Sequence, residues 1–168
     1  KSGKYLGTLH GHKLAIRSVV VSPDNLTAAS AGADGTIHIW DLQSLTEITK
    51  TKRQRGLIKA LTFSPDGRML YSGSSREGII IWNTADGSRV RNIGDFTGSI
   101  NSLSLSPDGR QLVIAEGQKI HLLDTELEEI ITTLQPHQDI VSSAIFSPLG
   151  NLIGSASLDN SVKLWRPP

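Results

Sequence analysis

The sequence contains no cysteine, carries almost no net charge and lacks long apolar runs. Without cysteine, the chain can form neither disulfide bonds nor cysteine-rich zinc sites. A net charge of +1 provides no overall basic field of the kind that attracts nucleic acid. No apolar run approaches the ~20 residues of a membrane-spanning helix, and the residues from Lys1 onward do not resemble an apolar leader. We therefore expect a cytoplasmic chain with no nucleic-acid or membrane partner.

Sustained helical periodicity is also missing, and a short motif recurs instead. Ser-Pro-Asp begins at Ser22, Ser64 and Ser106, and an altered copy begins at Ser147, which gives steps of 42, 42 and 41 residues. Proline presets the backbone of a turn, and the Asp that follows can bond nearby backbone groups. An apolar triplet precedes each turn, and its spacing predicts a short strand with a bulge near its start. The triplets are Ile16/Val19/Val21, Ile58/Leu61/Phe63, Ile100/Leu103/Leu105 and Val141/Ala144/Phe146.

Further strand-like stretches follow each turn, so that a full unit holds four strands. The fourth stretch is expected at residues 46–50, 88–93 and 129–134. A period of about 40–45 residues is that of one propeller blade. The sequence therefore predicts an all-β fold, a β-propeller of four-stranded antiparallel blades.

The first and last units resemble the WD-repeat (tryptophan-aspartate repeat) β-propeller family. Residues typical of that family are Gly11-His12, Ser30, Asp34 and Trp40-Asp41 in the first unit, and His137, Ser155, Asp159 and Trp165 in the fourth. The second unit keeps Ser72 and Trp82 but has Gln54 and Arg76 where the His and Asp fall. The third unit has Phe96, Ile114 and Leu123 in place of the His, Ser and Trp. We expect the second and third units to hold by apolar packing.

The resemblance implies a single domain over residues 1–168 with four WD-type repeats. Their approximate bounds are 11–50, 53–94, 95–135 and 136–168, and a strand over residues 4–9 is expected to complete the last blade. Three arrangements stay open: a small closed ring, half of an eight-bladed ring built from two chains, and a part of a longer propeller. Closure in any of these forms would remove exposed sheet edges.

His12, Ser30 and Asp34 are the residue types of a nucleophilic triad, and two interpretations follow. A hydrolase would need an exposed, activated Ser and a nearby oxyanion site. The resemblance instead implies a structural hydrogen-bonded chain from Trp40 through Ser30 and His12 to Asp34, with a second set made of Trp165, Ser155, His137 and Asp159. Two such sets in one chain favour the structural role. His10 and His12 lack further ligands at suitable spacing, so we expect no metal, and no glycine-rich loop indicates a cofactor.

The loops that carry the His and Asp positions form the face on which the resemblance implies partner binding. The basic run Lys50–Arg55 falls on this face, whereas Asp24, Asp66 and Asp108 fall in turns at the opposite face. Such polarity would attract an acidic protein or peptide. The predicted contact residues are Arg17, Leu57, Lys59, Arg76, Asn101, Ile140, Ser142 and Leu158.

We therefore predict a non-catalytic protein-interaction scaffold rather than an enzyme. The alternative is a self-assembly module whose main partner is a second copy or further blades of a longer chain. A hydrolase with a site in the central channel is disfavoured, because the innermost strands carry mostly small residues such as Ser18, Ala60 and Ser102.

Overall fold

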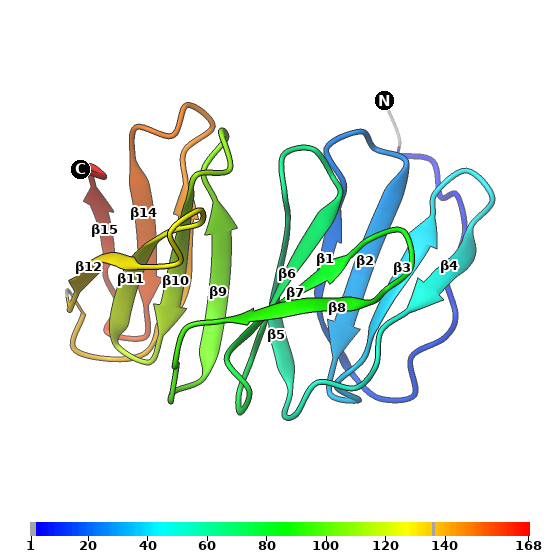
Figure 1. The fold of residues 1–168 in the computed structure, drawn as a ribbon, viewed down its shortest axis with the longest axis horizontal. Coiled ribbons are helices and arrows are strands. Elements are labelled where there is room, and N and C mark those ends of the chain that lie inside the picture. The colour runs from blue at the N-terminus through cyan, green and yellow to red at the C-terminus, as the bar shows by residue number, and fades with distance from the viewer. Residues whose placement is uncertain (1–2, 136) are drawn as a thin grey trace.

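The computed structural model describes residues 3–135 and 137–168, and these form four antiparallel sheets without helices (Figure 1). Blade 1 consists of β1 (Ile16–Val21), β2 (Thr27–Gly32), β3 (Ile37–Asp41) and β4 (Thr46–Lys50). Blade 2 consists of β5 (Ile58–Phe63), β6 (Met69–Ser74), β7 (Ile79–Asn83) and β8 (Arg89–Ile93). Blade 3 consists of β9 (Ile100–Leu105), β10 (Gln111–Glu116), β11 (Lys119–Asp124) and β12 (Ile130–Leu134). Blade 4 consists of β13 (Val141–Phe146), β14 (Ile153–Ser157) and β15 (Val162–Trp165). The predicted all-β propeller fold is confirmed, and no helix in the described ranges is long and apolar enough to cross a membrane.

Each Ser-Pro-Asp motif forms the tight turn between the first and second strands of its blade. In blade 1, the Ser22 hydroxyl donates to the Asp24 carboxylate and accepts the Thr27 N–H at 3.0 Å. The turn then needs a residue with positive φ, and Gly67 fills that position in blade 2 with φ of 71°. Blade 1 has Asn25 there, with φ of 60°, because asparagine tolerates the left-handed region better than most residues. The serine and aspartate side chains therefore fix the turn that reverses the chain.

A bulge interrupts the pairing of the first two strands in every blade. The register shifts between Ile16 and Ser18 in blade 1 and between Ile58 and Ala60 in blade 2. Corresponding shifts occur in blades 3 and 4. A bulge adds one residue to one strand, which accounts for the three-residue gap between the first two apolar positions of each triplet. The apolar positions of the triplet thereby stay on one face.

The hydrophobic core lies between the blades rather than within any one sheet. Ala29, Ala31 and Ile37 of blade 1 pack against the triplet Ile58, Leu61 and Phe63 of blade 2. The same arrangement joins blade 2 to blade 3 and blade 3 to blade 4. The innermost strands contact one another in the order β1, β5, β9 and β13. Three interblade layers therefore hold the four blades together.

The described residues of the four blades form a row that does not close into a ring. Within the described residues β1 and β13 are not among the packed strand pairs, and Figure 1 shows blades 1 and 4 on opposite sides of the molecule. The prediction that residues 4–9 complete the last blade is wrong for the single chain. That segment forms no strand, and β15 is the outer edge of a three-stranded sheet. The physical reason is distance, because Gly7 in this segment lies beside Leu45 of blade 1, on the opposite side of the molecule from blade 4 (Figure 1).

Candidate functional site

A chain of hydrogen bonds connects β2 and β3, the two middle strands of blade 1, to the loop that precedes β1. The Trp40 indole N–H donates to the Ser30 Oγ at 2.8 Å, and the same Oγ lies 2.9 Å from His12 Nε2. His12 Nδ1 lies 2.7 Å from Asp34 Oδ2. With the Nδ1 proton directed at the carboxylate, Nε2 accepts the Ser30 hydroxyl proton. The structure thus brings the four residues together in the order that the resemblance implies.

Electrostatics hold the Asp34 end of this chain in its charged form. Partial burial opposes ionisation of the carboxyl, but hydrogen bonds from His12 and Thr36 outweigh it and lower the pKa of Asp34 to about 2. The His12 side chain is 3 % exposed. Both of its ring nitrogens are therefore engaged in a nearly closed site.

Blade 4 repeats the arrangement with its own residues. Trp165 Nε1 lies 3.2 Å from Ser155 Oγ, and His137 Nε2 lies 2.9 Å from the same oxygen. His137 Nδ1 lies 2.9 Å from Asp159 Oδ2. Hydrogen bonds from Ser161, the Gln138 backbone and His137 outweigh desolvation and lower the pKa of Asp159. In both blades the serine Oγ is bonded to an indole and an imidazole, so neither serine presents a free nucleophile.

Blade 2 contains a third version of the chain, which the sequence analysis missed. Trp82 Nε1 donates to Ser72 Oγ at 2.8 Å, and Ser72 donates to Gln54 Oε1 at 2.7 Å. Gln54 Nε2 then donates to the Gly78 carbonyl at 3.2 Å. A primary amide has an acceptor and a donor at its end, as a neutral imidazole does. The prediction that this blade holds by apolar packing is therefore wrong, and the signal was Gln54 at the histidine position.

Blade 3 does replace the chain with apolar contacts. Ile114 and Leu123 are fully buried and Phe96 packs against the same cluster. Beside them, the Glu116 carboxylate accepts the Gly98 N–H and lies 3.0 Å from His121 Nε2. Phe96 contacts the His121 ring edge to face at 5.5 Å. The contact of Glu116 with Gly98 and His121 thus holds the loop that precedes β9.

His12, Asp34 and His38 form a group with the composition of a metal site, and their ligand atoms lie within 4.8 Å of one another. Each histidine already has another role. His12 bonds Asp34 and Ser30, whereas His38 lies against Trp40 and bonds Glu47 through Nδ1. We therefore assign these three residues to the hydrogen-bond network of blade 1 rather than to a metal site.

The predicted partner-contact residues lie around the loops at the start of the inner strands. Arg17, Arg76 and Ser142 are exposed, and Leu57, Ile140 and Leu158 are 36 %, 44 % and 59 % exposed. Lys59 and Asn101 are half-buried and connected to each other, since Lys59 Nζ donates to Asn101 Oδ1 at 3.2 Å. Asn101 Nδ2 in turn donates to the Val141 carbonyl at 3.2 Å. These two residues bridge blades 2, 3 and 4 as well as bordering the face.

Three arginines line one shallow pocket on the same face. Arg53, Arg55 and Arg76 surround Gly56, and the pocket volume is about 330 Å³. Glu77 lies nearby, but its carboxylate accepts the Arg55 backbone N–H at 2.6 Å and the Arg89 guanidinium at 3.1 Å. Among the described residues the three guanidinium groups form no ion pair. The pocket therefore concentrates positive charge without an internal counterion.

The opposite face carries the aspartates of the Ser-Pro-Asp turns. A hydrogen bond from the Ser22 hydroxyl, and another from the Leu26 N–H, lower the pKa of Asp24. Asp66 and Asp108 accept the corresponding bonds from Ser64 and Ser106, and their pKa values are lowered in the same way. These exposed carboxylates stay charged at neutral pH. Arg68 and Arg110 lie in the same turns as Asp66 and Asp108 and partly offset their charge, so the predicted acidic character of this face stays a prediction.

Comparison with known families decides how the repeated blades are classified. The WD domain, G-beta repeat family matches residues 3–41, 46–83 and 128–166, which together make up more than half of the chain. The chain belongs to the WD-repeat family. The matched ranges include every described strand of blades 1 and 4 and the first three strands of blade 2. Of blade 3, in which the His, Ser and Trp are replaced, they include only β12.

Curated WD-repeat relatives share one short segment with this chain. The eukaryotic translation initiation factor 3 subunit I of Phaeosphaeria nodorum is 42 % identical over 43 residues. The subunit of the same name in Botryotinia fuckeliana is 44 % identical over 43 residues. In both cases the shared segment spans 26 % of this chain and 13 % of the relative. The likeness is therefore to one repeat-sized part of those proteins.

Proposed function

We propose that this WD-repeat chain is a non-catalytic scaffold that binds an acidic segment of a protein partner on the face around Arg53, Arg55 and Arg76. The pocket lined by these arginines carries the proposal, because it combines three guanidinium groups that form no ion pair within residues 3–135 and 137–168. Arginine binds carboxylates through two parallel hydrogen bonds. A peptide with closely spaced Asp or Glu residues is the partner that this arrangement fits.

Apolar side chains beside the pocket would add affinity to the charge contacts. Leu57 directly follows Gly56 of the pocket and is 36 % exposed. Its backbone is fixed by the Ser75 N–H, which donates to the Leu57 carbonyl at 3.0 Å. Ile140 and Leu158 offer two more exposed apolar groups on blade 4. Interfaces commonly combine such anchors with a charged rim, so we propose these residues, with Arg17, Lys59, Asn101 and Ser142, as the contact surface.

The non-catalytic part of the proposal is supported by the state of the triad-like residues. Ser30 and Ser155 are buried, and each Oγ is bonded to both an indole and an imidazole. The relatives are named as subunits of a translation initiation factor. We extend to this chain a role as one subunit among protein partners in translation initiation, and with it a cytoplasmic location.

A fluorescein-labelled glutamate-rich peptide provides a direct test of the basic face. Fluorescence anisotropy at low and high salt should show binding that weakens as salt rises, since exposed charge pairs are screened. The triple variant R53S/R55S/R76S should bind at least tenfold more weakly. A matched variant at the opposite face, R68S/R110S, should bind as well as the unmodified protein, because those exposed arginines lie in the Ser-Pro-Asp turns.

Two outcomes would count against the proposal. Equal loss in both variants would indicate nonspecific attraction to net charge rather than a site. Equal affinity for a lysine-rich peptide would show that the face does not select acidic segments. Thermal melts of both variants serve as the folding control, and we expect them to match the unmodified protein because all five side chains are exposed.

A further inference from the structure

Blade 2 differs in charge from blades 1 and 4 at the Asp position of the repeat. In blade 1, Asp34 Oδ2 lies 2.7 Å from His12 Nδ1 and accepts the Lys13 backbone N–H at 3.4 Å. Blade 4 repeats both contacts with its own residues. Blade 2 has Arg76 at this position. A carboxylate with a structural role is thus replaced, in one blade, by a guanidinium.

Two other residues of blade 2 make the contacts that this Asp makes elsewhere. Gln54 needs no carboxylate, because its Nε2 donates to the Gly78 carbonyl at 3.2 Å. Glu77, the residue after Arg76, accepts the Arg55 backbone N–H at 2.6 Å. That N–H corresponds to the one that the Asp accepts in blades 1 and 4. The fold is therefore satisfied without the Arg76 side chain, which is exposed.

Hydrogen bonds fix the backbone on both sides of the pocket that contains Arg76. The Leu57 N–H donates to Ser75 Oγ at 3.0 Å, and the Ser75 N–H donates to the Leu57 carbonyl at 3.0 Å. Between the two sides, Gly56 has φ of 84°, and a Cβ there would lie 2.6 Å from Ser75 Oγ. The glycine thus lets the loop before β5 touch the hairpin between β6 and β7. The arginines of the pocket project from a fixed frame, which lowers the entropy lost on binding.

The acidic residue next to Arg76 in the sequence is directed at another arginine. Glu77 Oε1 accepts the Arg89 guanidinium at 3.1 Å, while Oε2 accepts the Arg55 backbone N–H. Within residues 3–135 and 137–168, the side chains of Arg53, Arg55 and Arg76 form no ion pair. Three unpaired guanidinium groups therefore line one pocket of about 330 Å³.

The donors in this pocket exceed those that one carboxylate uses. A guanidinium carries five N–H donors, and a single guanidinium can bind both oxygens of a carboxylate. A phosphorylated side chain offers three acceptor oxygens and a charge of about −1.5 to −2 at pH 7. Clusters of arginines recognise such groups in several classes of binding domain. Because the pocket is shallow, the short side chains of phosphoserine and phosphothreonine fit it better than phosphotyrosine does.

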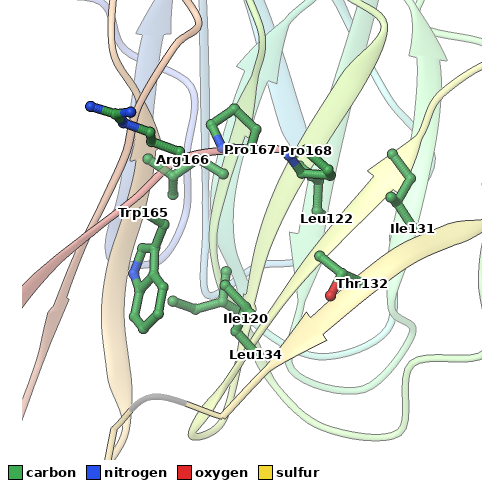
Figure 2. Close-up of a pocket in the computed structure, with 10 residues that line it drawn as sticks. Ile120, Leu122, Ile131, Thr132, Leu134, Trp165, Arg166, Pro167 and Pro168 are labelled. Carbon is green, nitrogen blue, oxygen red and sulfur yellow. The ribbon is translucent and has the colours of Figure 1, made fainter.

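The other sizeable pocket near the loops and strands of blades 3 and 4 has a different chemistry. Its volume is about 350 Å³, and its lining is mostly apolar. Figure 2 shows the Trp165 indole close to Ile120 and Leu134. Arg166 is the one charged residue of this lining, and its guanidinium points away from these side chains. A multiply charged anion therefore fits the arginine pocket of blade 2 and not this one.

We propose that the arginine pocket binds the phosphate group of a phosphorylated serine or threonine in a protein partner. This inference rests on the proposed function, because the phosphorylated residue belongs to the acidic segment assigned to the same face. Arg76 approaches the phosphate from the hairpin between β6 and β7, and Arg53 and Arg55 approach it from the loop before β5. Phosphorylation of the partner then raises its affinity for this chain.

Three fluorescein-labelled peptides test the preference for phosphate over carboxylate. They share one glutamate-containing sequence and differ at a central site, which holds serine, phosphoserine or two adjacent glutamates. The double-glutamate peptide matches the phosphoserine peptide closely in total charge. Fluorescence anisotropy at fixed ionic strength should show about tenfold tighter binding of the phosphoserine peptide than of the double-glutamate peptide.

The outcomes separate this inference from the function on which it rests. Equal affinity of the phosphoserine and double-glutamate peptides overturns the inference and leaves the proposed function standing. Failure of all three peptides to bind overturns both. Tighter binding of single-stranded poly(U) RNA than of the phosphoserine peptide would assign the arginines to a nucleic-acid phosphate and would also overturn the inference.

Variants at Arg76 test whether the pocket itself recognises the phosphate. Arg76→Asp introduces the residue type found in blades 1 and 4, so it should fold, as a thermal melt can check, and it should lose the preference for phosphoserine. Arg76→Lys keeps the charge without the two parallel N–H groups and should keep only part of the preference. The matched control, Arg68→Asp, makes the same change of charge at an exposed position in the Ser-Pro-Asp turn of the same blade and should keep the preference. A preference that survives in Arg76→Asp, or that is lost equally in Arg68→Asp, overturns the site.

Discussion

Removing the Ser72 hydroxyl tests whether the blade 2 chain stabilises the fold. Ser72 Oγ accepts the Trp82 indole N–H at 2.8 Å and donates to Gln54 Oε1 at 2.7 Å. Gln54 and Ser72 are 0 % exposed and Trp82 is 1 % exposed. The variant Ser72→Ala leaves one buried donor and one buried acceptor without a partner, and each such group costs about 1–3 kcal/mol. We expect the free energy of unfolding to fall by about 2–4 kcal/mol, since Gln54 keeps its bond to Gly78.

Urea unfolding followed by tryptophan fluorescence measures this difference at a fixed protein concentration. The slope of the free energy against urea should not change, because the variant exposes no new surface on unfolding. Ser142→Ala is the matched control, because it also removes a hydroxyl from a strand but at an exposed position. Its effect should stay within about 0.5 kcal/mol. A loss below about 1 kcal/mol for Ser72→Ala would refute the view that this chain is a buried polar network.

Two further predictions concern acid and packing. The pKa of Asp34 is about 2, below its ordinary 3.8, so its contribution to stability is complete above about pH 4 and is lost as pH falls toward 2. Between pH 5 and 2 the melting temperature should therefore fall more steeply for the unmodified protein than for Asp34→Asn. Parallel curves of melting temperature against pH would contradict this. At Gly73, an added Cβ would lie 2.3 Å from Ile100 Cγ2 between blades 2 and 3; Gly73→Ala should therefore cost about 1–3 kcal/mol in urea unfolding. The control Gly154→Ala, whose nearest contact would be Leu164 at 3.7 Å, should cost less than 1 kcal/mol, on the order of a surface change.

The repeat period and the turn chemistry were sufficient to predict the blades, and the resemblance to the WD-repeat family implied two of the hydrogen-bonded chains. Pro and Asp at fixed positions dictate the turns, and the bulged triplets dictate which face of each inner strand is apolar. The loss of the polar chain in blade 3 was also readable, because Phe96, Ile114 and Leu123 cannot form it. These features depend on residues within one repeat, so the sequence of that repeat determines them.

Features that join separate segments were harder to predict from the sequence. Gln54 replaces a histidine by matching its donor and acceptor, which a pattern written in residue names does not register. The arginine pocket also depends on residues from two separate segments. Gln54 points into the blade, so Arg53 and Arg55 on either side of it point outward, and the hairpin between β6 and β7 brings Arg76 beside them. The place of residues 4–9 depends on how far the row of blades curves, which no single repeat encodes.

In the proposed function, the basic loop face binds the partner and the Ser-containing chains stabilise the fold. Measuring both peptide affinity and melting temperature for two variants separates these two roles. R53S/R55S/R76S should lose at least tenfold in affinity for the glutamate-rich peptide and keep its melting temperature. Ser30→Ala should melt at a lower temperature and, well below that temperature, bind the peptide as the unmodified protein does. Loss of peptide binding in folded Ser30→Ala, with binding retained in the arginine variant, would contradict the proposed function.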